Sequence, residues 1–141
     1  MLLEKINLFS KSIELKMAEI CDRFDLTMTD IYILMFLDNS DDKNAASKKI
    51  IETGANKEEV NRSINNLVKR GYIKAWYPND EIDNINLKLG DSSRYVVSLI
   101  SESREDYLRV ILEGFEQSER DLLSDYMKRI VTNIYNNMKK K

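Results

Sequence analysis

A stretch in the middle of the chain carries amide and cationic side chains at helical spacing. It runs from Asn56 to Ile73, and its polar face consists of Lys57, Asn61, Arg62, Asn65 and Lys69. In the major groove of DNA, an Asn side chain can hold an adenine edge with two hydrogen bonds, and an Arg side chain can hold a guanine edge in the same way. The stretch therefore predicts base contacts by Asn61, Arg62 and Asn65, and phosphate contacts by the two lysines. The alternative interpretation is an ordinary solvated helix face.

An amphipathic helix is needed to hold those side chains outward. Asn56 is a residue type that caps helix starts, and Glu59, three residues later, completes a capping-box pattern. Gly71 is expected to end the helix, because glycine readily adopts the left-handed conformation found at such ends. Apolar residues at helical spacing form the expected buried stripe, which consists of Val60, Ile64, Leu67 and Val68.

Three further helices are predicted before this one, over about Leu3 to Phe24, Met28 to Leu37 and Asn44 to Glu52. Thr27 and Asp30 have the types and spacing of a cap for the second helix. A short glycine-containing turn separates the third helix from the polar one, which is a helix-turn-helix arrangement and places the later helix for insertion into a DNA groove. The expected core residues of the second and third helices are Ile33, Leu34, Leu37, Ala46, Ile50 and Ile51.

Beyond Gly71 the periodicity changes from helical to extended. Residues 72–77 read as one strand, Pro78-Asn79-Asp80 as a turn, and the alternation of Ile85, Leu87 and Leu89 with polar residues as a second strand. Two strands joined by a polar tip form a β-hairpin, or wing. Two helices then follow, over about Ser93 to Phe115 and Glu119 to Met138.

Composition limits the classes of protein and site that the chain can form. Of its 141 residues 43% are hydrophobic and 33% charged, which is typical of a globular chain, while only four are glycine and one is proline, which favours long helices. The net charge of −2 means that nucleic-acid binding would depend on a local basic patch.

The sequence lacks the residue types that several kinds of functional site require. The chain has no histidine and one cysteine, so we expect no internal disulfide, no typical zinc site and no cofactor. Without histidine or a phosphate-binding glycine loop, no catalytic constellation can be identified, and we expect no enzyme. The sequence lacks both an apolar run long enough to span a bilayer and a signal-peptide pattern, so we expect a cytoplasmic location and no membrane partner.

The order of elements and several local signatures resemble the MarR family of bacterial winged helix-turn-helix regulators. The matching segments are Leu26-Thr27, Leu34 with Leu37, Val60-Asn61-Arg62 and residues 67–73, while Leu89 lies 18 residues after Gly71, where that family usually carries a Leu-Thr pair. The resemblance covers nearly the whole chain. The expected fold is mainly α, a winged helix-turn-helix lobe at 26–90 with a helical dimerisation region at 1–25 and 91–141.

The resemblance also implies function. It implies a homodimer built from the first, fifth and sixth helices, a pseudo-palindromic site on double-stranded DNA, and a small-molecule pocket. Together these describe a transcription regulator, a repressor in our interpretation, that an effector releases from DNA. The aromatic candidates for lining the effector pocket are Tyr32, Phe36, Trp76, Tyr95 and Tyr107, and the alternative for each is core packing.

Two positions call for separate interpretation. The family often carries an Asp-x-Arg motif in the wing, whose Arg reaches the minor groove, but the corresponding residues here are Glu81-Ile82-Asp83. An acidic wing tip is repelled by phosphates, so the alternative function is a winged-helix protein that has lost DNA binding and serves as a protein-interaction module. Cys21 is interpreted as a buried structural thiol, against the alternative of the redox sensor found in some members of the resembled family.

Overall fold

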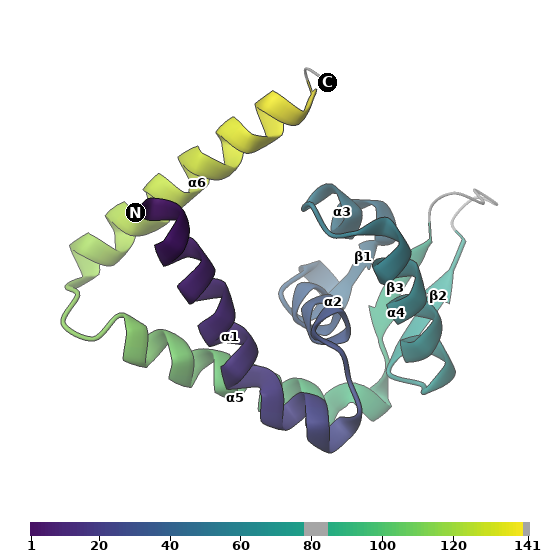
Figure 1. Cartoon of the computed structure of the whole chain (residues 1–141). Coiled ribbons are helices and arrows are strands. Elements are labelled where there is room, and N and C mark those ends of the chain that lie inside the picture. The colour runs from purple at the N-terminus through teal and green to yellow at the C-terminus, as the bar shows by residue number, and fades with distance from the viewer. Residues whose placement is uncertain (78–84, 140–141) are drawn as a thin grey trace. The chain divides into compact units, whose positions relative to one another are not determined.

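A computed structural model describes residues 1–77 and 85–139 and has a mainly helical fold with one small sheet (Figure 1). It divides into two compact units, Met1–Glu105 and Asp106–Lys141. The elements of the first unit are α1 (Leu2–Phe24), α2 (Met28–Asp38), β1 (Asn44–Ala46), α3 (Ser47–Glu52), α4 (Lys57–Lys69), β2 (Ile73–Trp76), β3 (Asn86–Leu89) and the start of α5 (Arg94–Ile111). The predicted turn at 78–80 and the acidic wing positions Glu81 and Asp83 lie outside the described residues. The mainly α winged helix-turn-helix fold expected from the sequence is confirmed.

The core of the first unit is centred on α2. The predicted cap of this helix forms: the backbone N–H of Asp30 donates to Thr27 Oγ1 at 3.1 Å, and the Thr27 N–H donates to Asp30 Oδ2 at 3.0 Å. The predicted core residues Ile33, Leu34 and Leu37 are fully buried. Burial on nearly every side of α2 explains why this helix is apolar almost throughout.

The sheet has the order β1-β3-β2, with both pairings antiparallel. Its first strand corrects the prediction of a helix over Asn44–Glu52, because residues 44–46 form β1 and the helix starts only at Ser47. Ala46, expected to face inward on that helix, instead pairs with Asn86 in the sheet. A strand of three residues has too little sequence to show a period, and only pairing with the distant β3 defines it.

Helix α4 forms as predicted at both ends. The Asn56 side chain accepts the backbone N–H of Glu59 at 3.1 Å, which is one of the two hydrogen bonds of a capping box. At the other end, Gly71 has φ +77°, and the N–H groups of Gly71 and Tyr72 donate to the carbonyls of Val68 and Leu67. This is a Schellman motif, and it turns the chain directly into β2.

The buried stripe of α4 differs from the prediction at one residue. Val60, Ile64 and Leu67 are buried, but Val68 is 40% exposed, and Ser63 is buried instead. Val68 also has helical spacing, four residues after Ile64, but it lies at the edge of the stripe formed by residues 60, 63, 64 and 67, so spacing and apolar type misled the prediction.

The connection from the sheet to α5 depends on a glycine. A Cβ atom at Gly90 would lie 2.6 Å from the carbonyl oxygen of Gly71, which is too close for any side chain. The Gly90 N–H donates to the carbonyl of Tyr72 at 2.9 Å, and Ser92 Oγ donates to the carbonyl of Gly71. The end of α4 and the start of α5 are thereby fixed to one another.

The second unit consists of the end of α5 and α6 (Gln117–Lys139). Helix α5 ends at Ile111, before the predicted Phe115, and α6 starts two residues before the predicted Glu119. Arg120 stabilises the turn between them, because its guanidinium donates to the carbonyls of Phe115 and Leu112 at 3.2 and 3.1 Å. Within the described parts of the chain, no helix combines the length and apolarity that crossing a membrane requires.

Candidate nucleic-acid interface

The predicted DNA-reading residues all lie exposed on α4. Asn61, Arg62, Asn65 and Lys69 lie away from the buried stripe, whereas Lys57 is exposed at the first position of the helix, on the side of Val60. The Arg62 guanidinium makes no hydrogen bond or ion pair with the described residues, so no internal partner competes with a ligand for it. Burial of Val60, Ile64 and Leu67 fixes which way the polar face points. The arrangement can therefore offer amide and guanidinium groups to a groove about as wide as a helix.

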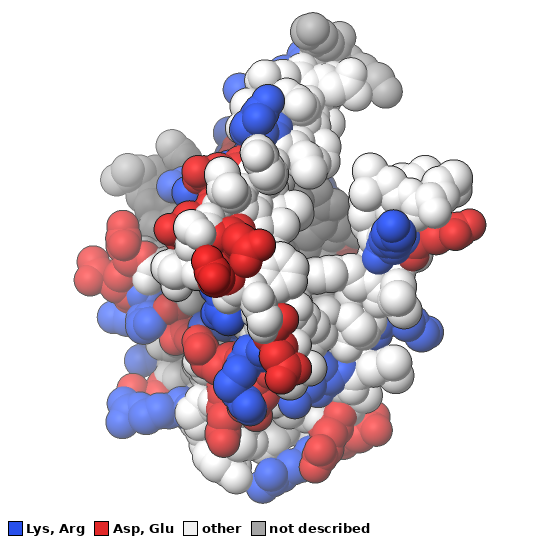
Figure 2. Space-filling view, turned by 90° about the vertical axis from the view of Figure 1, so that its left-hand side faces the viewer, with Lys and Arg blue, Asp and Glu red and all other residues white. Residues whose placement is uncertain are grey.

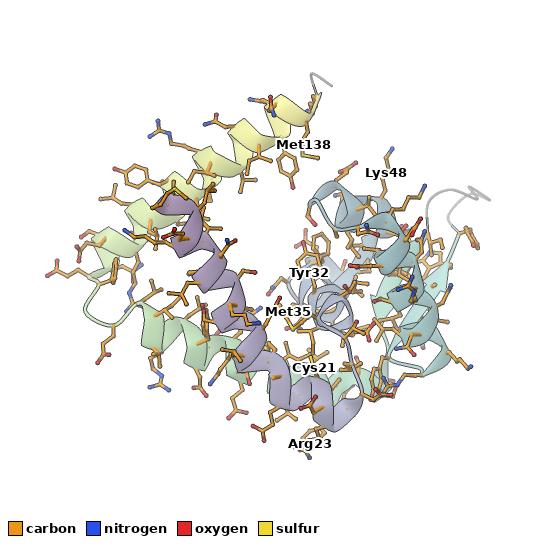
Figure 3. The ribbon with its side chains drawn as sticks, viewed as in Figure 1. Cys21, Arg23, Tyr32, Met35, Lys48 and Met138 are labelled. Atoms are coloured by element: carbon orange, nitrogen blue, oxygen red, sulfur yellow. The ribbon has the colours of Figure 1, made fainter. Side chains whose placement is uncertain are left out.

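Two basic residues that sequence analysis did not select lie on the preceding helix. Lys48 and Lys49 are exposed on α3, and Figure 3 shows Lys48 pointing outward from that helix. In a helix-turn-helix, the first helix crosses the DNA backbone. Lysine side chains at that position can contact phosphates. Their position in a helix-turn-helix and their charge were visible in the sequence and could have identified them.

The base of the hairpin carries a second pair of lysines. Lys74 on β2 and Lys88 on β3 are both exposed and lie directly opposite each other in the antiparallel register. Like charges directly opposite each other destabilise a sheet. An anionic partner bound beside this pair would remove the repulsion between the two lysines. Ile73 and Leu87 point to the opposite face and are buried. Only the register of the strands brings the two lysines together.

A hollow of about 430 Å³ lies beside Arg62, between the start of α2 and α4. Its lining includes Thr29, Glu59 and Ser63 in addition to Asp30, which is 2% exposed. Asp30 Oδ2 accepts hydrogen bonds from the Thr27 N–H and from Asn66 Nδ2, at 3.0 and 3.4 Å. Asp30 Oδ1 is buried without a hydrogen-bond partner among the described residues. The carboxylate therefore caps α2 and also contacts α4.

The predicted effector-pocket residues are only partly brought together. Tyr32 and Phe36 are neighbours on α2, with ring centroids 6.3 Å apart, and the Tyr32 hydroxyl donates to Thr53 Oγ1 at 2.6 Å. Figure 3 shows Tyr32 projecting from α2. Trp76 is 42% exposed at the end of β2, and Tyr107 belongs to the second unit. The pocket remains a prediction.

The structure places Cys21 in a half-buried position, where the sequence predicted a buried one. Its Sγ donates to Met28 Sδ at 3.9 Å, and the side chain is half-buried on α1 (Figure 3). Burial raises the pKa of the Cys21 thiol, and the charges of Asp22 and Asp30 raise it further. Since the thiolate is the reactive form, this environment opposes rapid oxidation.

One face of the molecule carries charges of both signs. The face in Figure 2 intersperses Lys and Arg with Asp and Glu. Among the described residues, no three His, Cys, Asp or Glu side chains lie together as metal ligands would. The α3–α4 surface with the adjoining hairpin base is therefore the best candidate site.

A polar helix presented by a helix-turn-helix and followed by a hairpin defines the winged helix-turn-helix class of DNA-binding regulators. Residues 16–76 match the family model described as "Transcriptional regulator SarA/Rot". The chain therefore resembles SarA/Rot regulators over that segment and has the fold of the MarR winged-helix regulators, as the sequence predicted. Comparison with curated proteins gave no match.

Solved structures of MarR-family regulators have the same fold. A regulator from Listeria monocytogenes, assigned to the MarR family and complexed with a 26mer DNA, is 21% identical, with a TM-score of 0.82 over 96% of this chain and 89% of that one. A MarR protein from Peptoclostridium difficile is 16% identical, with a TM-score of 0.80 over 99% and 92%. NadR in complex with 4-hydroxyphenylacetate is 14% identical, with a TM-score of 0.78 over 93% and 92%.

Proposed function

We propose that this protein is a cytoplasmic repressor that binds a pseudo-palindromic DNA site as a homodimer. The observation that carries the proposal is the outward face of α4, where Asn61, Arg62 and Asn65 are exposed. Each protomer would insert α4 into a major groove, and two-fold symmetry would separate the half-sites by about 34 Å, one helical turn of DNA.

The phosphate contacts are proposed to come from both sides of the recognition helix. Lys57 and Lys69 lie on α4 itself, and Lys48 and Lys49 on α3 would meet the backbone beside it. The opposed lysines of the hairpin base, Lys74 and Lys88, would offset the repulsion from the acidic residues of the wing tip. This favours DNA binding over the alternative protein-interaction module.

Exposed apolar side chains on the terminal helices support the homodimer. On α1 the exposed set includes Leu3, Ile6 and Phe9, and on α6 a stripe at alternating spacings of three and four consists of Leu123, Met127, Ile130 and Ile134, each 41–52% exposed. Such spacing is the pattern of a helix that packs against another helix. A second copy of the chain would cover these residues.

Control by a small molecule is the remaining part of the proposal. NadR was crystallised with 4-hydroxyphenylacetate, and Tyr32 with Phe36 offers adjacent rings for an aromatic ligand here. An effector would release DNA only if it binds more tightly to a dimer whose recognition helices are wrongly spaced.

Selection from a pool of random duplexes at two salt concentrations tests the proposed function. We expect enrichment of a palindrome, with an affinity that falls steeply with salt because phosphate contacts release counterions. A folded dimer that enriches no sequence and binds no duplex at low salt would contradict the proposal and favour the protein-interaction module.

A further inference from the structure

Two polar side chains in the last turns of α4 hold a distant part of the chain. Asn66 and Arg70 are one helical turn apart, so they lie on the same side of the helix. Both contact the segment that joins α1 to α2, which consists of residues 25–27 and the helix ends on either side. We call this segment the α1–α2 junction.

Arg70 makes the stronger attachment. Its guanidinium donates to the carbonyl of Phe24 at 2.5 Å and to the carbonyl of Asp25 at 2.8 Å. These carbonyls belong to the last turn and the cap of α1, where Asp25 has left-handed φ +53° and ψ +55°. The guanidinium carbon also lies 4.9 Å from the Tyr72 ring centroid, in a cation–π contact. A cation suits this place, because the carbonyls at a helix C-terminus carry partial negative charge.

Asn66 makes the second attachment, at the start of α2. Its Nδ2 donates to Asp30 Oδ2 at 3.4 Å, and the same oxygen caps α2 through the Thr27 N–H. The end of α1 and the start of α2 are therefore both tied to the recognition helix. The Arg70 guanidinium is occupied by the two carbonyls of α1, so it is not offered to a DNA phosphate.

We propose that Arg70, assisted by Asn66, is a positioning residue that fixes the recognition helix to the α1–α2 junction, so that the orientation of α1 sets the orientation of α4. This role rests on the proposed DNA binding by α4, and the contacts of Arg70 and Asn66 would regulate that binding. Helix α1 exposes apolar side chains along its first half. Any movement of this helix would be transmitted to α4 through the hydrogen bonds from Arg70 to the carbonyls of Phe24 and Asp25.

The first test needs no DNA. Arg70→Ala should accelerate amide hydrogen exchange at Leu26, whose N–H donates to the Cys21 carbonyl at 2.9 Å, and at Tyr72, while exchange in α6 stays unchanged. Arg70→Lys keeps the charge but cannot donate to both carbonyls in the same planar geometry, so it should show a smaller acceleration. Unchanged exchange at Leu26 and Tyr72 in folded Arg70→Ala protein would overturn the attachment itself.

The second test measures DNA binding to the duplex enriched from the random pool. Arg70→Ala should weaken binding by about tenfold or more per active dimer, with an unchanged slope of log affinity against log salt concentration, because no phosphate contact is lost. The matched control is the neighbouring Lys69→Ala, which should reduce that slope by about one. The active fraction is determined by stoichiometric titration, since a purely structural role would lower that fraction and leave the affinity of the folded dimers unchanged.

The two tests separate the possible failures. Accelerated exchange with wild-type affinity, or a reduced salt slope in Arg70→Ala, would overturn the positioning role. Wild-type protein that binds no duplex would contradict the proposed function, while the exchange result would still decide whether Arg70 holds the junction. If Arg70→Ala does not fold, the same exchange and affinity measurements on Arg70→Lys decide the proposal, and wild-type values in both would overturn it.

Discussion

The winged helix-turn-helix lobe and helix α6 use apolar residues in opposite ways. In the lobe, apolar side chains from α2, α3, α4 and the sheet are buried against one another, and Leu34 and Leu37 are completely inaccessible. Helix α6 carries as clear an apolar stripe, but none of its described residues is buried. The lobe thus completes its packing within the first unit, whereas the second unit leaves the apolar stripe of α6 exposed. The comparison teaches that apolar periodicity predicts a helix without predicting what covers it.

The largest expected effect comes from a charge placed in the α6 stripe. Ile130→Glu puts a carboxylate into the centre of the proposed subunit interface, where an unpaired buried charge is strongly unfavourable. We expect sedimentation to show monomers at micromolar concentration and specific DNA binding to be lost. Thr132→Glu, on the opposite side of α6, is the matched control and should remain dimeric. A dimer that withstands Ile130→Glu would show that α6 is not the interface.

A cavity in the lobe should have the next largest effect. Leu34→Ala removes a fully buried side chain, so it should lower the free energy of unfolding by about 2–5 kcal/mol, measured by urea denaturation at fixed protein concentration. Leu15→Ala on α1, where the side chain is 69% exposed, is the control and should have little effect. Equal losses for the two variants would contradict the contrast between a completed core and an exposed surface.

Removing a DNA-reading side chain should weaken binding without affecting the fold. Arg62→Ala is expected to reduce affinity for the enriched duplex by about 1–3 kcal/mol and to relax preference at one base pair. Fluorescence anisotropy with single-base variants of the duplex measures both quantities, and the thermal unfolding midpoint should stay close to that of the wild type. Unchanged affinity would remove Arg62 from the site.

The smallest effect concerns Cys21, which lies on α1 near its packed end. Because the thiol pKa is raised, the thiolate should be scarcer at neutral pH than for a free cysteine, and alkylation by iodoacetamide should be slow. The alkylation rate should increase with pH through a midpoint above the ordinary thiol value. The urea-unfolded protein is the control, and equal rates at neutral pH in the two states would contradict a protected thiol.

Local residue patterns predicted the helices that carry their own start and stop signals. Thr27 with Asp30 and Asn56 with Gly71 marked α2 and α4 because caps depend on residues a few positions apart. The sequence could not show that Asn44–Ala46 is a strand, since its partner β3 lies some forty residues later. Nor could it pair Lys74 with Lys88, because register is a property of two strands together. Arg70 escaped notice because its acceptors are backbone carbonyls, which every residue has.

The uncovered stripe of α6 also bears on how such a regulator would respond to its own abundance. In the proposed dimer, assembly depends on the square of the protomer concentration, so at low cellular levels most chains would be single and unable to span both half-sites. Occupancy of a DNA site would then rise more steeply than the amount of protein. Near the concentration at which dimers form, a small change in synthesis or degradation would therefore produce a large change in occupancy of the DNA site.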